Sequence, residues 1–246
     1  MFLQPFEVVS NYIAMKNFKP KLIPTLITIP AMILLLSLGS WQVVRLQWKN
    51  NLIDNIKHQM SLPEIDLSNT EPKDNDSFRK AKADGTFDHS KEIHLYAGAR
   101  EFKGKDGYRI FTPLKLQNGK FILVDRGWVP AGKKLQNTRP ETIIQGVVSV
   151  SGVIMEGEKK KFFTPENDIK NKMWFWIDIK AMKQESGLSY PDFYLMQEES
   201  KDKSRHLPIG RSASPNIYNN HLSYAIIWYS CALSLAVIYF LSSKRD

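Results

Sequence analysis

Two long runs of uncharged, mostly apolar residues lie near the two ends of the chain. Residues 22–44 form a run of 23 positions and residues 222–243 form a run of 22, with a polar stretch between them. A helix rises about 1.5 Å per residue, so about 20 residues cross a hydrocarbon core of about 30 Å. We therefore expect an integral membrane protein with transmembrane helices at 22–44 and 221–243 and one folded domain at 45–220.

The charges beside these runs predict the orientation of the chain in a membrane. Three lysines precede the first run, while Lys244 and Arg245 follow the second. By the positive-inside rule, segments 1–21 and 244–246 are cytoplasmic and the domain between the helices is exported. Arg45 opposes this orientation, but long loops are exported largely regardless of their charge. We expect a multi-pass protein of the bacterial plasma (inner) membrane whose main domain is periplasmic.

The N-terminal residues suggest two alternatives. Ser37-Leu38-Gly39 resembles the small-x-small site of a cleaved signal peptide, but the uncharged run is longer than the apolar region of a signal, about 7–15 residues. Segment 1–17 contains Glu7 and no arginine, unlike a mitochondrial presequence. These features favour an uncleaved first helix in a bacterial membrane.

Alternating apolar and polar positions between the two runs predict a mainly β domain. The clearest signal is a hairpin, because Asn118-Gly119 supplies the two positive-φ positions of a type I′ turn between strands 108–116 and 121–129. Further strands are expected at Glu92–Ala97, Ile143–Met155, Trp174–Ile179 and Phe193–Gln197. The spacing predicts a small, mainly antiparallel barrel or sandwich with a minor helix.

Other local patterns account for the remainder of the domain. Apolar residues at helical spacing predict a short amphipathic helix over Asn50–Met60, and the Pro-, Asn- and Ser-rich stretch Ser61–Ser77 predicts a loop. One or two helical turns are expected over Ile179–Glu185, ending at a glycine. Gly146 and Gly152 interrupt a predicted strand and indicate a bulge or bend there.

Composition narrows the possible partners. The formal net charge is +9, but acidic residues are interleaved with the basic ones, so we expect no nucleic-acid partner. The densest basic cluster, Lys159-Lys160-Lys161, lies beside a Phe-Phe pair; a solvated surface and contact with anionic lipid headgroups both stay open. The single cysteine, Cys231, rules out an intramolecular disulfide, a zinc ribbon and a CxxCH haem-attachment site.

The sequence does not indicate an enzyme. It contains no GxSxG, Walker A, GxGxxG or HExxH motif. His89 and His94 are five positions apart, which places them on opposite faces if both lie on one strand and argues against a shared metal. Asp125 and Arg126 lie at a strand end, where a structural ion pair between them is favoured over an acid–base pair.

The outer ends of the two membrane helices are more informative. Trp41, Arg45 and Trp48 share one face of the first helix, as in an aromatic belt with a snorkelling arginine. On the second helix, Asn219-Asn220 is expected to cap the helix start. At 100° per residue, an arc of about 80° contains His221, Tyr224, Trp228 and Cys231. A histidine there suits a haem iron, with aromatic rings against the macrocycle, or else a hydrogen bond to a headgroup or loop.

Four motifs resemble those of the surfeit locus protein 1 family. They are Gly39–Lys49 (GSWQVVRLQWK), Gly107-Tyr108 with Thr112-Pro113-Leu114, Leu123–Pro130 (LVDRGWVP), and Asn219–Ala225 (NNHLSYA) with Trp228. They occur in the family's order and cover the chain from about Gly39 to Trp228. The stretch from Arg139 to Gln197 matches only loosely, so no functional residue is carried over from it.

The resemblance implies an assembly factor for haem–copper cytochrome c oxidase that binds haem a as cargo and aids its insertion into the catalytic subunit. Bacterial relatives are described as binding haem a through the histidine of the NNH motif, which here is His221. Further contacts with the haem are expected from Tyr224, Trp228, Arg45 and Trp41. Arg126 is a second candidate, beside Arg45, for binding a haem propionate.

The expected partners follow from the same resemblance. They are cytochrome c oxidase subunit 1, haem a synthase and the lipid bilayer. One alternative is a structural partner that stabilises an oxidase assembly intermediate without binding haem. Another is a periplasmic enzyme of unknown chemistry, for which the sequence offers no clustered nucleophile and base.

Overall fold

The computed structural model describes residues 20–73, 75–99, 102, 104–199, 207–211 and 219–244. The chain divides into two compact units. One unit is drawn from Met1–Asp54 and Ile217–Asp246, and the other is Asn55–Asn216. The first contains the helices with the long apolar runs, and the second contains the sheet.

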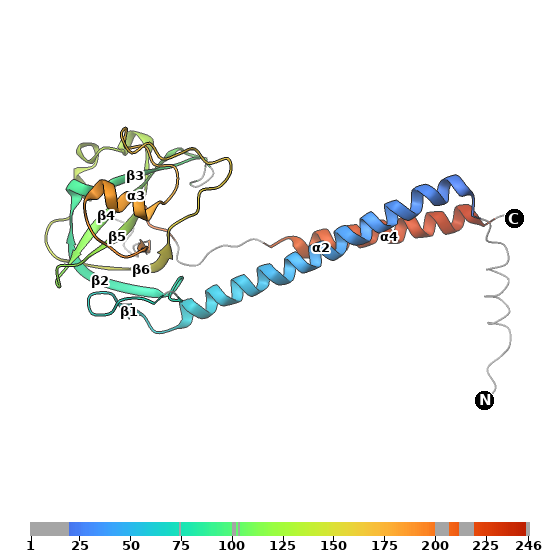
Figure 1. The fold of residues 1–246 in the computed structure, drawn as a ribbon, viewed down its shortest axis with the longest axis horizontal. Coiled ribbons are helices and arrows are strands. Elements are labelled where there is room, and N and C mark those ends of the chain that lie inside the picture. Colours follow the sequence, from blue (N-terminus) through green and yellow to red (C-terminus); the bar gives the residue numbers. More distant parts are fainter. Residues whose placement is uncertain are drawn as a thin grey trace, which may run out of the picture. The chain divides into compact units, whose positions relative to one another are not determined.

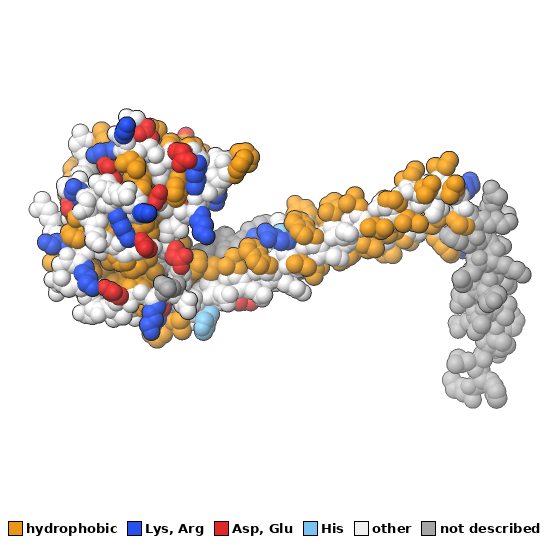
Figure 2. Space-filling model, in the orientation of Figure 1, with side chains coloured by type: hydrophobic (Ala, Val, Ile, Leu, Met, Phe, Trp, Pro, Cys, Tyr) orange, Lys and Arg blue, Asp and Glu red, His pale blue; other side chains and the backbone are white. Residues whose placement is uncertain are grey.

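Two helices are long and apolar enough to cross a membrane, α2 (Leu22–Ser61) and α4 (His221–Ser243). At 1.5 Å per residue, the 40 residues of α2 extend about 60 Å, twice the hydrocarbon thickness. The transmembrane helix and the amphipathic helix predicted from the sequence are therefore parts of one continuous helix, with Pro30 inside it. The outward surfaces of both helices are covered by exposed large apolar side chains (Figure 2), as lipid contact requires.

The two helices pack against each other in antiparallel fashion (Figure 1). The less exposed positions of α2 recur every three or four residues and include Thr25, Thr28, Met32, Leu35, Gly39, Gln42, Leu46 and Lys49. The matching positions of α4 include His221, Ala225, Trp228, Ala232, Leu235, Tyr239 and Ser243. A repeat of this kind is typical of a left-handed helix pair. Small residues in both sets allow the backbones to approach closely.

In the described part of the second unit, seven strands and one short α-helix follow the end of α2. The strands are β1 (Ile65–Asp66), β2 (Lys80–Phe87), β3 (Ile93–Ala97), β4 (Gly107–Leu116), β5 (Phe121–Pro130), β6 (Val148–Glu156) and β7 (Phe193–Gln197). The helices are α3 (Ile179–Ser186) and the 3-10 turns His89–Lys91, Ala131–Lys133, Gln136–Thr138 and Pro140–Thr142. The sheet order is β1-β2-β6-β7-β5-β4-β3, and an additional β2–β4 pairing closes it into a small barrel. Its pairs are antiparallel except β1–β2 and β5–β7.

The barrel strands have apolar side chains on both faces, and each face builds its own core. The interior cluster consists of Ile65, Leu67, Ala81, Ala83, Phe87, Leu114, Leu116, Ile122, Val124, Val150, Ile154 and Leu195. The outer cluster consists of Ile93, Leu95, Phe111, Leu123, Val153, Trp174, Ile177, Ile179, Met182, Tyr190, Tyr194 and Met196. Alternate residues of β5, β6 and β7 enter the two clusters, as the period of two in a strand requires. Helix α3 and the segment around Trp174 therefore seal one side of the barrel.

Several predictions from the sequence are confirmed. The fold class is right, because two apolar helices flank a mainly antiparallel barrel with a minor helix. The strand predicted at Phe193–Gln197 is β7, and the one at Glu92–Ala97 differs from β3 by one residue. Helix α3 ends at Gly187, which is in the left-handed conformation. The hairpin of β4 and β5 is also present.

The turn type of that hairpin was predicted wrongly. Only Gly119, at φ +82°, has a positive φ, whereas a type I′ turn needs two such residues. The Gly119 amide donates to the Leu116 carbonyl at 3.0 Å, and the Leu116 amide donates to the Lys120 carbonyl at 2.8 Å. These two bonds enclose a three-residue loop, a turn followed by a left-handed glycine.

Two strand predictions and one loop prediction need correction. Trp174–Ile179 is not a strand; only an isolated bridge joins Trp174 to Leu95, because this segment packs its apolar side chains on the outside of the barrel. The strand predicted from Ile143 begins at Val148, and Gly152 pairs in regular register without a bulge. The predicted loop Ser61–Ser77 contains the two-residue strand β1.

Strand β2 was missed. Its Asp84-Gly85 pair is typical of a turn, and its interior positions are filled by the small residues Ala81 and Ala83. A Cβ at Gly85 would overlap the Lys115 carbonyl oxygen of β4. The glycine therefore permits the close approach of β2 to β4 at which the barrel closes.

Candidate functional site

The candidate site lies where α4 begins, beside α2. Asn220 occupies the N-cap position of α4, but its side chain makes no capping bond. The Asn219 side chain caps the helix instead, since its Oδ1 accepts a hydrogen bond from the His221 amide at 3.4 Å. Asn219 Nδ2 also donates to Asn50 Oδ1 of α2 at 2.9 Å. The NNH motif thus sets both the start of α4 and its register against α2.

His221 faces α2 and contacts one polar side chain there. Its Nδ1 lies 2.7 Å from Oε1 of Gln42, which is 9% exposed. A carbonyl oxygen only accepts hydrogen bonds, so Nδ1 is the donor in this contact, and Nε2 is the ring nitrogen available to a metal. Among the described residues, no hydrogen-bond partner is found for Nε2. An imidazole held at Nδ1 with a free Nε2 is the usual arrangement of a metal-binding histidine.

The stripe of Trp41, Arg45 and Trp48 on α2 is confirmed as one face of the helix. The Arg45 guanidinium lies over the Trp48 ring, 4.5 Å from its centroid. Trp41 and Trp48 are each slightly more than half exposed, so this face points away from α4. The structure therefore presents a flat aromatic surface with a cation beside the helix interface.

Helical geometry brings Tyr224 to the same side of the pair. At 100° per residue, Trp41 and Arg45 are rotated from Gln42 in the same sense as Tyr224 is from His221. Two antiparallel helices that face each other are related by an approximate twofold axis perpendicular to both. Residues rotated in the same sense from the facing positions of each helix therefore lie on the same side of the helix pair. Tyr229 is rotated in the opposite sense and contacts the other side, where its ring lies 2.8 Å from a Cβ placed on Gly39.

Trp228 faces α2, as His221 does, and so differs from Tyr224, which is exposed. Its position belongs to the packing repeat of α4, and its Nε1 is buried without a hydrogen-bond partner within the described part of the chain. Cys231 is exposed. Helical geometry thus places Tyr224, Trp41 and Arg45 on one side of the pair, while His221 and Trp228 lie between the helices.

Gln42 was missed by the sequence analysis, although it lies within a quoted motif. The available signal was a strongly polar side chain in an uncharged membrane run, three residues after Gly39 and four before Leu46 on the packing repeat. Polar residues inside membrane helices usually face a neighbouring helix and bind a partner there.

The predicted ion pair of Asp125 with Arg126 is wrong. Asp125 accepts from Arg109, whose Nε lies 3.0 Å from Oδ2, and both side chains are buried. The Arg126 Nη2 donates to the Thr142 carbonyl at 2.7 Å, and burial lowers the pKa of Arg126 to about 10. Enclosed in the barrel domain, this guanidinium is not placed to bind a haem propionate.

The remainder of the LVDRGWVP motif holds the segment 207–211 against the barrel. Trp128 exchanges two backbone hydrogen bonds of 2.8 Å with Ile209. Gly127 has φ +117°, and a Cβ there would overlap the Ile209 carbonyl oxygen. Only glycine satisfies both conditions. This motif is therefore structural.

Two histidines of the barrel domain, His89 and His94, have structural partners as well. His94 Nε2 lies 2.7 Å from Glu92 Oε1, and Glu92 also pairs with the buried Arg139. Burial raises the pKa of Glu92, but hydrogen bonds from His94 and Arg139 outweigh it, so the net shift is downward. His89 Nε2 contacts the Ile144 backbone. No group of three or more His, Cys, Asp or Glu side chains suited to a metal occurs among the described residues.

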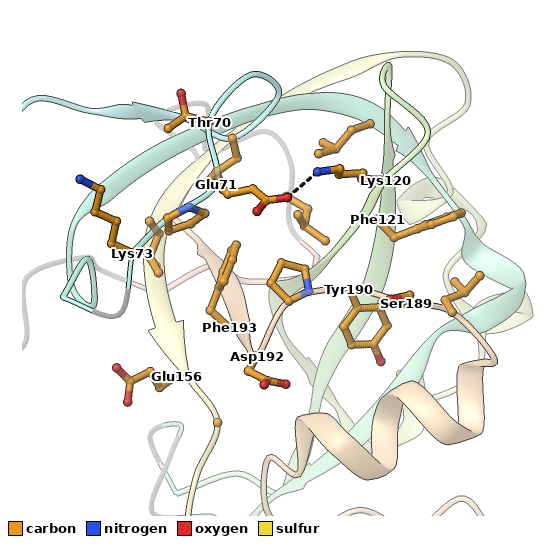
Figure 3. A pocket seen from close by; sticks show the side chains of 18 of the residues that line it. Thr70, Glu71, Lys73, Lys120, Phe121, Glu156, Ser189, Tyr190, Asp192 and Phe193 are labelled. Atoms are coloured by element: carbon orange, nitrogen blue, oxygen red, sulfur yellow. Dashed lines mark hydrogen bonds and ion pairs between the residues drawn. The ribbon is translucent and has the colours of Figure 1, made fainter.

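The barrel domain has an open cavity of about 1110 Å³ that the sequence did not predict (Figure 3). Its walls carry Phe121, Tyr190 and Phe193 together with the ion pair of Lys120 and Glu71. Among the residues that the structure describes, no histidine, cysteine or methionine lines it, so these offer no usual haem iron ligand beyond a tyrosine.

Comparison with known proteins assigns the family. A model described as the SURF1 family matches residues 29–233. The SURF1-like protein of Rickettsia felis is 37% identical over 209 residues, which cover 84% of this chain and 90% of the relative. Surfeit locus protein 1 of Takifugu rubripes is 31% identical over 219 residues, covering 82% and 90%; that of Xenopus tropicalis is 32% identical over 213 residues, covering 80% and 68%. The chain therefore belongs to the SURF1 family, whose members are known as cytochrome oxidase assembly factors.

Proposed function

We propose that this membrane protein binds haem a on the α2–α4 pair and aids its insertion into subunit 1 of cytochrome c oxidase. The observation that carries the proposal is the contact of His221 Nδ1 with Gln42 Oε1, which leaves Nε2 free. Family membership supplies the connection to the oxidase.

The residues around His221 suit a haem in chemistry as well as in placement. With Nε2 unprotonated, the imidazole offers the lone pair that an iron ligand needs. Trp41 and Tyr224, each about half exposed on the same side of the helices, offer rings for the macrocycle. Arg45 offers charge-assisted hydrogen bonds to a propionate. Haem a is cargo in this proposal, and no catalytic step is required.

The same proposal includes the orientation and the partners. The cytoplasmic termini and periplasmic barrel of a bacterial inner-membrane protein put His221 at the outer edge of the bilayer, because it begins α4. A carrier in this place receives haem a from its synthase and delivers it to oxidase subunit 1. The exposed position of the site, open on one side of the helix pair, favours transfer over permanent binding.

The test is purification of the full chain from cells that make haem a, followed by absorption spectroscopy. We expect a Soret band in the wild type and its loss in His221→Ala, with both proteins inserted at equal levels. His58→Ala, in the last turn of α2, is the matched control and should keep the haem. If His221→Ala kept full haem occupancy and an unchanged spectrum, the ligand assignment would be wrong. A structural partner that binds no haem would then be favoured.

A further inference from the structure

Two phenylalanines stand at the tip of a turn between β6 and α3. Phe162 is 91% exposed and Phe163 is 92% exposed, and their rings contact each other edge to face at 4.9 Å. The Thr164 amide donates to the Lys161 carbonyl at 3.0 Å, so the two aromatic residues are the central positions of a β-turn. Turn centres usually hold Gly, Pro, Asn, Asp or Ser. Two large apolar side chains at this point mark a contact surface.

Hydrogen bonds on both sides of the turn fix its position on the barrel domain. The Glu158 amide donates to the Ile177 carbonyl at 2.9 Å on one side. On the other side, Asn167 Oδ1 accepts from the Phe175 amide at 2.8 Å, and Asn167 Nδ2 donates to the Trp176 carbonyl at 3.1 Å. The phenylalanines are thus presented outward by a hydrogen-bonded loop.

Three consecutive lysines lead into the same turn. All three lysines are exposed, and Lys160 pairs with Glu166. Lys161 is the first residue of the turn, so its charge lies directly beside Phe162. Basic residues beside exposed aromatic ones are typical of segments that lie in the headgroup region of anionic bilayers.

We propose that residues 159–163 form a lipid-contact turn, in which Phe162 and Phe163 enter the headgroup region of an anionic bilayer and the lysines bind lipid phosphates. The occupant is a lipid surface because the chain itself carries two helices suited to span a membrane. Attachment to the bilayer gives the turn a high effective concentration of headgroups, so a small contact suffices. The inference is independent of the haem site.

The test uses the full chain in nanodiscs with neutral or anionic lipid. An environment-sensitive fluorophore is placed at Thr164→Cys in a Cys231→Ser background, and lipids carrying a nitroxide at the headgroup act as quenchers. We expect strong quenching in anionic nanodiscs and weak quenching in neutral ones. Replacing the three lysines by glutamine should lower the ratio of docked to free turn by roughly 100-fold. Each lysine contributes a factor of about ten or less to this ratio.

Two variants make the test specific. Phe162→Ser with Phe163→Ser should abolish quenching in anionic lipid. Removing three other exposed lysines should leave it unchanged; these are Lys91, Lys105 and Lys115. Equal quenching in both lipids, or loss of quenching in this control, would overturn the proposal. A blue-shifted fluorophore without lipid quenching would also overturn it, in favour of a protein partner.

Discussion

Replacing Gln42 by leucine tests the geometry of the proposed haem site most directly. Leucine has a similar size and keeps the packing of α2 on α4, but it removes the acceptor that lies 2.7 Å from His221 Nδ1. A buried donor left without a partner costs about 1–3 kcal/mol. The imidazole also loses the contact that fixes its tautomer and ring orientation. Loss of such an outer contact typically lowers metal affinity about 10–100-fold, which is the same range of free energy.

The assay is titration of haem a into the full-length protein in nanodiscs, followed in the Soret region. We expect Gln42→Leu to weaken binding about 10–100-fold, and Gln42→Glu to retain most of it, since a carboxylate also accepts from Nδ1. Ser40→Ala is the matched control, because it removes the 3.2 Å contact with Tyr229 on the other side of the pair. Wild-type affinity in Gln42→Leu, together with complete loss in His221→Ala, would refute the role of Gln42.

Four further outcomes are expected. Arg45→Ala should weaken haem retention less than His221→Ala does, because an interfacial ion pair is partly screened; equal losses in a haem titration would contradict this. Gly119→Val should lower the free energy of unfolding by about 1–3 kcal/mol in urea titrations, because φ at Gly119 is +82°. The lowered pKa of Glu92 gives stability that is present above its ordinary value of 4.5 and is lost as the pH falls below it. Glu92→Gln should therefore show a smaller loss of stability on acidification, and an unchanged pH profile would exclude Glu92 as a cause. A reporter fused at Lys244 should score as cytoplasmic.

The sequence predicted features that depend on nearby residues. Helices, the hairpin and β7 follow from local periodicity or turn chemistry, and His221 was found because it lies in a quoted motif. What escaped prediction depends on contacts between distant residues. Asp125 pairs with Arg109 of the neighbouring strand, not with the adjacent Arg126, because alternate residues of a strand face opposite sides. Gln42 meets His221 across 179 positions of sequence.

Barrel closure illustrates the same limit. The β2–β4 pairing needs a glycine whose sequence neighbour, Asp84, makes the pair look like a turn. Nothing within a few residues of Gly85 distinguishes the two possibilities. Trp174 shows the converse, since its segment has the alternation of a strand but lies over the barrel instead of joining its ladder.

The anchoring of Ile209 by Gly127 has a consequence for how variants of this protein would fail in cells. Any side chain at Gly127 strains the backbone and pushes away the segment that follows the barrel on the way to α4. Such a variant is expected to be degraded, and its defect should ease at low growth temperature. A Gln42 variant should instead accumulate normally and remain unloaded. Variants at Gly127 and at Gln42 would thus give the same respiratory defect for different reasons. The first leaves too little protein and the second leaves inactive protein, and immunoblotting would distinguish the two.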